Sequence, residues 1–228
     1  MDKKKIMRSI VVLAIILVFS SPLRAATVYW TDWTSVLATT PGVLGTLDIG
    51  SSVVDVSFSG PYSFAQTSGG TNYWIPNTPY LSATVGNAPP ASDIIGLSAG
   101  GTATITFSEA VQDPLIALVS FNGNTVEFGV PIEILSYGHG YWGNGTPILN
   151  SGGTGFYGSG EVHGVVRVPG SFESLSFTHT PEGWHGITVG VVGLGTPPPP
   201  NTVPEPTTML LLGFGLVGVA VFGRKRPR

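Results

Sequence analysis

The sequence has no cysteine and few charged residues. None of its 228 residues is Cys, and Asp, Glu, Lys and Arg together make up 10% of the chain. A chain without Cys forms no disulfide and no thiolate metal site, so its stability has to come from burial of apolar side chains. The part between the two chain ends, about 170 residues, is long enough to form such a core.

Positive charge is almost absent from the middle of the chain. Five of the ten Lys and Arg lie at or before Arg24 and four at or after Arg224, which leaves Arg167 alone between them. The stretch from Asp32 to Glu182 sets eleven acidic residues against that one cation, a net charge of −10. Such a surface repels the phosphates of nucleic acids. We therefore expect no nucleic-acid partner.

Long apolar runs are also lacking between the chain ends. The run from Leu115 to Phe121 has seven residues, whereas a membrane-spanning helix needs about 20. At the N-terminus, Lys3, Lys4, Lys5 and Arg8 precede an apolar run over residues 10–19 and then small residues. This order is typical of a secretory signal peptide. We predict a signal peptide over residues 1–25.

The C-terminus combines a tripeptide motif, an apolar segment and a basic cluster. Val203, Pro204, Glu205 and Pro206 are followed by sixteen mostly apolar, uncharged residues and Gly223, and the cations Arg224, Lys225, Arg226 and Arg228 lie at the end of the chain. Sixteen helical residues rise about 24 Å, which is short of the roughly 30 Å hydrocarbon core. We predict a transmembrane helix over residues 207–223 and, by the positive-inside rule, a basic cytoplasmic tail over residues 224–228.

This C-terminal order resembles the PEP-CTERM sorting signal. The Pro-Glu-Pro tripeptide, the length of the apolar segment, the basic cluster and the position at the chain end all agree with it. The resemblance implies a transient encounter with an exosortase-type membrane protease, which removes the tail near residues 203–206. It also implies anchoring in the inner membrane before cleavage and release to the cell surface or extracellular matrix. A simple C-terminal membrane anchor is the alternative.

Between the ends, the pattern of side chains predicts strands. Residues 52–59 and 102–107 alternate apolar and polar side chains, and residues 115–121 are apolar on both faces, as in a central strand. Further predicted strands are residues 126–128, 132–135, 162–168, 174–180 and 187–192. We predict an all-β domain over residues 27–195, an antiparallel β-sandwich with jelly-roll-like connections; a barrel is the alternative.

Three longer stretches carry no strand pattern. They are residues 66–79, 86–93 and 137–160, and we expect them to be irregular loops. Residues 196–206 form a proline-rich linker that contains the Pro-Glu-Pro motif. Short segments such as residues 29–35 and 184–190 are similar to those of domains in other proteins of the same sorting family, which implies a β-rich secreted domain but no activity for particular residues.

Two stretches match the residues of known functional motifs but are not followed by the helix that each motif requires. Residues 96–100 fit the G-x-S-x-G pattern of serine hydrolases, but a predicted strand rather than a helix follows Ser98. Residues 138–143 fit the G-x-G-x-x-G pattern of dinucleotide-binding proteins, again without a following helix. We therefore predict no catalytic residue and no cofactor.

The histidines do not have the spacing of a metal site. His139, His163, His179 and His185 contain no H-E-x-x-H pattern and no close pair that would preset zinc geometry. Glu161 and His163 would share one face of a strand, and we expect a simple exposed pair there; contact with a metal ion is the alternative. We predict no metal site.

Aromatic residues in the expected loops are the remaining functional signal. Flat rings beside amide and carboxylate groups suit the C–H face and the hydroxyl groups of a sugar. The candidate contact residues are Trp74, Tyr141, Trp142, Trp184 and His185. The same rings would serve equally well to anchor long loops to the sandwich.

Two functions follow from the sequence. We predict a non-enzymatic surface or exopolysaccharide-matrix protein with carbohydrate-binding loops. The alternative is a secreted, glycosidase-like hydrolase, which would need two carboxylates facing each other in one aromatic-lined cleft.

Overall fold

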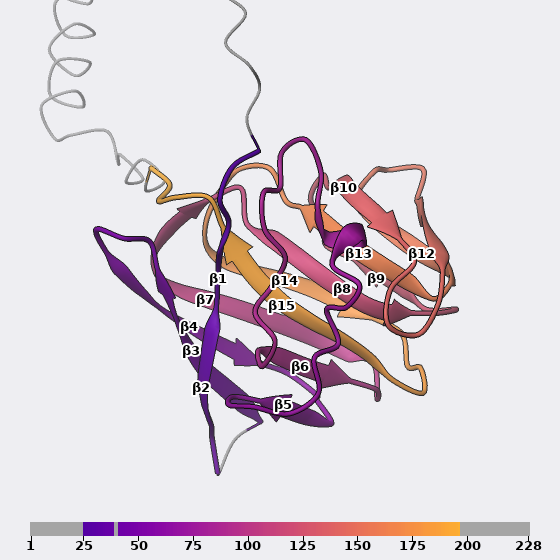
Figure 1. The fold of residues 1–228 in the computed structure, drawn as a ribbon, viewed down its shortest axis with the longest axis horizontal. Helices are drawn as coiled ribbons and strands as arrows, with labels where there is room; N and C mark the ends of the chain where they lie inside the picture. Colours follow the sequence, from indigo (N-terminus) through magenta and orange to yellow (C-terminus); the bar gives the residue numbers. More distant parts are fainter. Residues whose placement is uncertain (1–24, 39–40, 197–228) are drawn as a thin grey trace, which may run out of the picture. The chain divides into compact units, whose positions relative to one another are not determined.

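A computed structural model describes residues 25–38 and 41–196, which form two antiparallel β-sheets (Figure 1). The all-β prediction is confirmed for these residues. Apart from Ala25, the predicted signal peptide lies outside them, as do the transmembrane helix, the basic tail and all of the linker after Thr196. Among the described residues, no helix has the length and apolar character needed to cross a bilayer.

One sheet has seven strands. Its order is β10-β13-β8-β15-β6-β5, and β1 pairs with β15 beside this path. The strands are β1 (Tyr29–Trp30), β5 (Phe64–Gln66), β6 (Ile94–Leu97), β8 (Leu115–Phe121), β10 (Glu133–Gly138), β13 (Val162–Arg167) and β15 (His185–Val191).

The other sheet has eight strands. Its order is β11-β12-β9-β14-β7-β4-β3-β2. The strands are β2 (Asp32–Val36), β3 (Gly42–Asp48), β4 (Val53–Ser59), β7 (Gly101–Gln112), β9 (Thr125–Glu127), β11 (Gly145–Leu149), β12 (Gly155–Gly160) and β14 (Ser171–His179). A short 3-10 helix, η1 (Thr78–Tyr80), lies in the connection between β5 and β6.

The two sheets share one hydrophobic core, which makes the arrangement sandwich-like. In β4, Val54, Val56 and Phe58 are buried and alternate with polar side chains, as the sequence predicts. They belong to the same cluster as Ile116 and Leu118 of β8 in the other sheet. The period of two therefore places one face of each sheet in the core.

The outer face of the seven-stranded sheet is covered as well. Ala117 and Val119 of β8 point away from the first core and pack in a second cluster with Trp74, Tyr80 and Val85. These last three belong to the long connection between β5 and β6, which therefore covers this face of the sheet. Because both faces of β8 are covered, all seven of its residues are buried, which explains its continuous apolar sequence.

The expectation of an irregular loop over residues 137–160 is wrong in part. The hairpin of β11 and β12 occupies much of it, paired from Gly145 with Gly160 to Leu149 with Phe156. A Cβ atom on Gly155 would lie 2.2 Å from the carbonyl oxygen of Val126, so glycine is needed here for close contact between strands. From the sequence alone, a glycine that permits close contact between strands cannot be distinguished from a glycine in a turn.

Candidate functional site

Five aromatic side chains from four segments form one contiguous group, here called the ring cluster. Phe64 stacks on Trp184 with ring centroids 5.7 Å apart, and Tyr73 lies 5.0 Å from Trp184. Tyr141 lies 5.1 Å from Tyr73 and 5.0 Å from Trp142. Trp142 in turn lies 6.5 Å from Trp184. Three connections and the edge strand β5 therefore meet at this point.

The ring cluster has an inner and an outer part. Phe64, Tyr73 and Trp184 are half-buried and pack against the second core. Tyr141 and Trp142 keep 39% and 56% of their surface exposed. The inner rings thus hold the outer rings in place, which gives a rigid apolar surface open to solvent.

Three of the five predicted contact residues meet in the ring cluster, and two do not. Tyr141, Trp142 and Trp184 are members. Trp74 is 1% exposed and packs edge-on against Tyr80, with ring centroids 5.2 Å apart, so it anchors its loop in the second core. His185 is fully buried. Neither Trp74 nor His185 presents a surface to a ligand from solvent, because neighbouring side chains already cover both.

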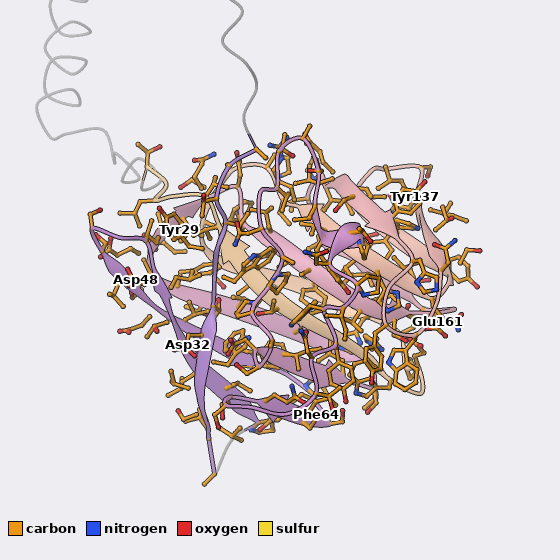
Figure 2. The ribbon with its side chains drawn as sticks, in the orientation of Figure 1. Tyr29, Asp32, Asp48, Phe64, Tyr137 and Glu161 are labelled. Carbon is orange, nitrogen blue, oxygen red and sulfur yellow. The ribbon has the colours of Figure 1, made fainter. Side chains whose placement is uncertain are left out.

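Two carboxylates lie beside the ring cluster, and one residue binds both. The side-chain amide of Asn122 donates to Glu161 at 2.7 Å, and its backbone N–H donates to Glu182 at 3.2 Å. The hydroxyl of Ser120 donates to the other oxygen of Glu161 at 2.5 Å. A Cβ atom on Gly143 would lie 3.6 Å from Cγ of Glu161, so this carboxylate is close to the loop that carries Trp142. Phe64 and Glu161 are labelled in Figure 2.

The backbone of β8 explains how Ser120 reaches Glu161. Ser120 has a positive φ of 59°, which is uncommon for a residue other than glycine. The register between β8 and β13 shifts next to it, between Val162 and Gly164. Such a bulge redirects side chains at the end of a strand. Sequence reasoning missed Ser120, Asn122 and Glu182, because nothing in the local pattern marks a bulge that joins them.

His163 holds the Trp142 loop and is not part of an exposed pair. The expectation of such a pair with Glu161 is wrong, because His163 is fully buried. Its Nε2 accepts the backbone N–H of Trp142 at 3.4 Å, which leaves the proton on Nδ1, 3.0 Å from the carbonyl oxygen of Glu161. Burial is the main cause that lowers the pKa of His163, which favours this neutral form.

A chain of buried polar contacts extends from the ring cluster into the core. Glu182 lies 3.2 Å from Nδ1 of His185, and its side chain is 15% exposed. Nε2 of His185 lies 3.0 Å from Nδ1 of His179. Burial, and then the charge of His185, lowers the pKa of His179 to about 4. The two histidines come from different sheets, because His179 ends β14 and His185 begins β15.

The structure places the two sequence patterns in a connection between strands and in a tight turn. Ser98 lies between β6 and β7, and its carbonyl oxygen accepts the backbone N–H of Glu182 at 3.0 Å. Gly140 and Gly143 close a tight turn in which the N–H of Gly140 donates to the carbonyl of Gly143 at 2.7 Å. Within residues 25–38 and 41–196, no three His, Asp or Glu side chains are placed to hold a metal ion.

The comparison with protein families concerns the C-terminus. Residues 202–226 match the PEP-CTERM protein-sorting motif. The chain therefore carries a PEP-CTERM sorting motif at its C-terminus. The match includes Val203 to Pro206 and the cations Arg224, Lys225 and Arg226, whereas Arg228 lies beyond it. All of these residues lie outside those that the structure describes. No curated protein and no solved structure matches the chain.

The PEP-CTERM motif indicates export and processing by exosortase, a membrane enzyme. It covers the sorting region and not the β domain. Within that domain, Arg167 pairs with Glu133, so the single cation between Asp32 and Glu182 is already engaged.

A groove of about 520 Å³ lies on the eight-stranded sheet, away from the ring cluster. It is lined mainly by hydroxyl side chains such as Thr34, Ser57 and Thr106, and it contains none of the five rings. The ring cluster, which combines exposed aromatic rings with nearby carboxylates, therefore remains the candidate binding site.

Proposed function

We propose that this PEP-CTERM protein is a non-enzymatic, exported module that binds polysaccharide through the ring cluster. The observation that carries the proposal is the solvent-facing pair Tyr141 and Trp142, supported from behind by Trp184. Aromatic faces pack on the C–H faces of sugar rings, and the amide and carboxylates of Asn122 and Glu161 offer hydrogen bonds to hydroxyl groups.

The charge of the domain favours a neutral polysaccharide as the ligand. Eleven acidic residues against Arg167 give a field that repels uronic acids, sulfates and phosphates. Binding through ring stacking and hydrogen bonds does not require opposite charges on the protein and the polysaccharide. We therefore expect neutral glucans or amino-sugar polymers to bind better than anionic polymers.

Export to the cell surface or extracellular matrix completes the proposal. A signal peptide over residues 1–25 would direct secretion, and a helix over residues 207–223 would hold the chain in the inner membrane until exosortase cleaves it. The order of the sheets supports jelly-roll-like connections, because the chain passes from one sheet to the other from β6 to β7, from β7 to β8 and from β8 to β9.

Substitution of Trp142 tests the proposal. The full chain in detergent micelles is incubated with insoluble cellulose or chitin, sedimented and compared with Trp142→Ala. We expect the variant to lose at least about fivefold in retention at an unchanged melting midpoint, because an exposed ring supports little of the core. The matched control is Tyr157→Ala, which removes an exposed ring on β12 outside the cluster. Equal retention of the variant and the parent chain would refute the proposed site.

A second candidate function rests on the two carboxylates. Asn122 holds Glu161 and Glu182 beside the ring cluster, and hydrolysis of a glycosidic bond needs one carboxyl group as a proton donor and a second as nucleophile or base. Release of reducing ends from a polysaccharide by the parent chain, lost in both Glu161→Gln and Glu182→Gln, would favour this function. Retention without release of reducing ends would favour the binding module.

A further inference from the structure

A polar contact crosses the hydrophobic core next to the ring cluster. His179 of the eight-stranded sheet and His185 of the seven-stranded sheet meet at 3.0 Å, and their residues are 4% and 0% exposed. The connection between them, residues 180–184, carries both Glu182 and Trp184. Because Trp184 directly precedes His185 in the chain, a change in the contact between the two histidines would shift this inner ring.

The surroundings of the two histidines are apolar apart from Glu182. His185 lies 4.6 Å from the ring of Phe121, and His179 lies 6.0 Å from that of Phe177. The neighbouring strand positions are also apolar, Leu97 opposite His185 and Val126 opposite His179. Among the described contacts, the one charged group that faces the pair is Glu182, and Glu161 is joined to it only through Asn122.

The contact tolerates one extra proton but not two. The hydrogen bond needs a proton on one of the two facing nitrogens and a lone pair on the other. One added proton still leaves a lone pair on one of the two facing nitrogens, so the hydrogen bond between the rings persists. A second positive charge, on His179, places protons on both facing nitrogens and two cations in rings 5.0 Å apart. Among the residues that the structure describes, Nε2 of His179 has no partner that would accept its proton.

We propose that His179 and His185 form an acid-sensitive latch that regulates the ring cluster. While the pair carries at most one positive charge, it ties β14 to β15 and fixes the connection that positions Trp184. Uptake of the second proton breaks the tie, frees residues 180–184 and weakens the binding of polysaccharide. The part of this proposal that concerns binding rests on the proposed function.

The direction of the pKa shift supports the latch. His179 has a pKa of about 4 in the closed form, against 6.5 for an ordinary histidine. As the pH falls from 6.5 towards 4, the open form takes up the proton and the closed form does not. The closed form is therefore fully favoured above about pH 6.5, and the equilibrium for opening rises by up to about tenfold for each pH unit below it.

Hydrogen exchange of the full chain in detergent micelles tests the latch without any polysaccharide. Exchange is measured by mass spectrometry between pH 7 and 4.5 and corrected for the intrinsic pH dependence of exchange. We expect opening of residues 179–186 to rise severalfold to tenfold per pH unit, while β3 and β4 change much less. No rise in the parent chain would overturn the proposal.

The matched variants isolate His179. In His179→Asn the amide takes the place of Nδ1 and does not titrate, so opening should lose its pH dependence. His139→Gln, at an exposed position, should keep the response of the parent chain. If His179→Asn fails to fold, His179→Gln, whose side chain likewise does not titrate, provides the same comparison. An unchanged acid response in the folded variant would overturn the latch.

Retention on cellulose or chitin at pH 7 and 4.5 separates the latch from the proposed function. A drop at pH 4.5 in the parent chain, absent in His179→Asn, supports regulation of binding. Retention that stays equal at both pH values while exchange rises overturns the regulatory role. No retention at either pH, together with the expected exchange, refutes the binding function and leaves the conformational latch in place.

Discussion

Phe64 stacks on Trp184 with the ring planes 10° from parallel, which joins the edge strand β5 to the connection between β14 and β15. Trp184 also contacts Tyr73 and Trp142. It is thus the ring through which the outer part of the ring cluster rests on the domain. The support of the ring cluster and the proposed ligand contact therefore involve the same side chain.

We expect Trp184→Ala to lower both stability and binding. Removal of a half-buried indole that packs on three other rings should cost about 2 to 3 kcal/mol in the free energy of unfolding, less than a fully buried Trp. Urea unfolding measures the cost, and sedimentation with cellulose measures retention well below the unfolding transition. A full loss of retention without any change in the unfolding midpoint would contradict the supporting role of Trp184.

Trp74→Ala should act on stability alone. Its side chain is buried against Tyr80, so truncation leaves a cavity, and we expect a cost of about 3 to 5 kcal/mol in the free energy of unfolding. At temperatures where the variant is still folded, retention on polysaccharide should equal that of the parent chain. Thermal unfolding by near-ultraviolet circular dichroism, run beside Trp142→Ala, makes the comparison. An unfolding midpoint that stays in place would show that Trp74 is not an anchor.

Stability should fall as the pH drops below about 6.5. Burial lowers the pKa of His163 in the folded chain, so the unfolded chain takes up its proton first. The contribution of His163 is fully present above pH 6.5 and declines below it. His179, with a folded pKa of about 4, acts in the same direction and adds to the loss of stability between pH 6.5 and 4.

Urea unfolding at pH 7 and pH 5 measures this dependence. His163→Gln keeps an acceptor at the place of Nε2 and should show a smaller loss between the two pH values than the parent chain. His139→Gln, at an exposed position, removes a minor charge effect on the pKa of His163 and should change the loss less than His163→Gln does. A loss as large in His163→Gln as in the parent chain would exclude His163 as a source.

Close packing around Gly155 gives a test of the β11–β12 hairpin. A Cβ atom there meets the carbonyl oxygen of Val126 at 2.2 Å, so Gly155→Ala has to push β9 and β12 apart, and we expect a cost of about 1 to 3 kcal/mol in the free energy of unfolding. At Gly183 a Cβ atom would have nothing within 4 Å. Gly183→Ala is therefore the matched control, expected to change stability by less than about 0.5 kcal/mol. Similar unfolding midpoints for the two variants would contradict the close approach of β9 and β12.

Processing at the PEP-CTERM motif predicts the mass of the mature protein. In cells that contain a matching exosortase, extracellular protein should end near residues 203–206, and intact-mass spectrometry measures this. Substitution of Pro204, Glu205 and Pro206 by Ala should leave the tail attached. Extracellular chains that still end at Arg228 would speak against exosortase cleavage.

The sequence alone predicted several strands correctly but did not predict which residues form the candidate site. Alternation in β4 and β7 and the continuous apolar run of β8 predicted these elements, because the period of two and burial on both faces act locally. The sequence contains Tyr-Trp three times, and the two copies in expected loops, at residues 73–74 and 141–142, have opposite outcomes. Trp74 is buried and Trp142 is exposed, and nothing in the neighbouring residues distinguishes them, because loop side chains follow no period.

The two carboxylates show the same limit. Glu161 and Glu182 share Asn122 as a hydrogen-bond donor because Asn122 follows a bulge in β8 and because β13 and β15 both pair with β8. Contacts of this kind depend on the pairing of strands far apart in the chain. The sequence supplied the residue types that hydrolysis would need, but their proximity is a property of the sheet order.

The pair of Arg167 and Glu133 has a consequence for how the domain is retained outside the cell. With its one cation engaged, the domain has no positive charge left to attract it to acidic envelope lipids or anionic polymers. After release from its membrane anchor, it would be held by contacts that salt does not screen. Washing with concentrated salt would then remove charge-bound matrix proteins and leave this one in place, whereas a soluble competing sugar would displace it.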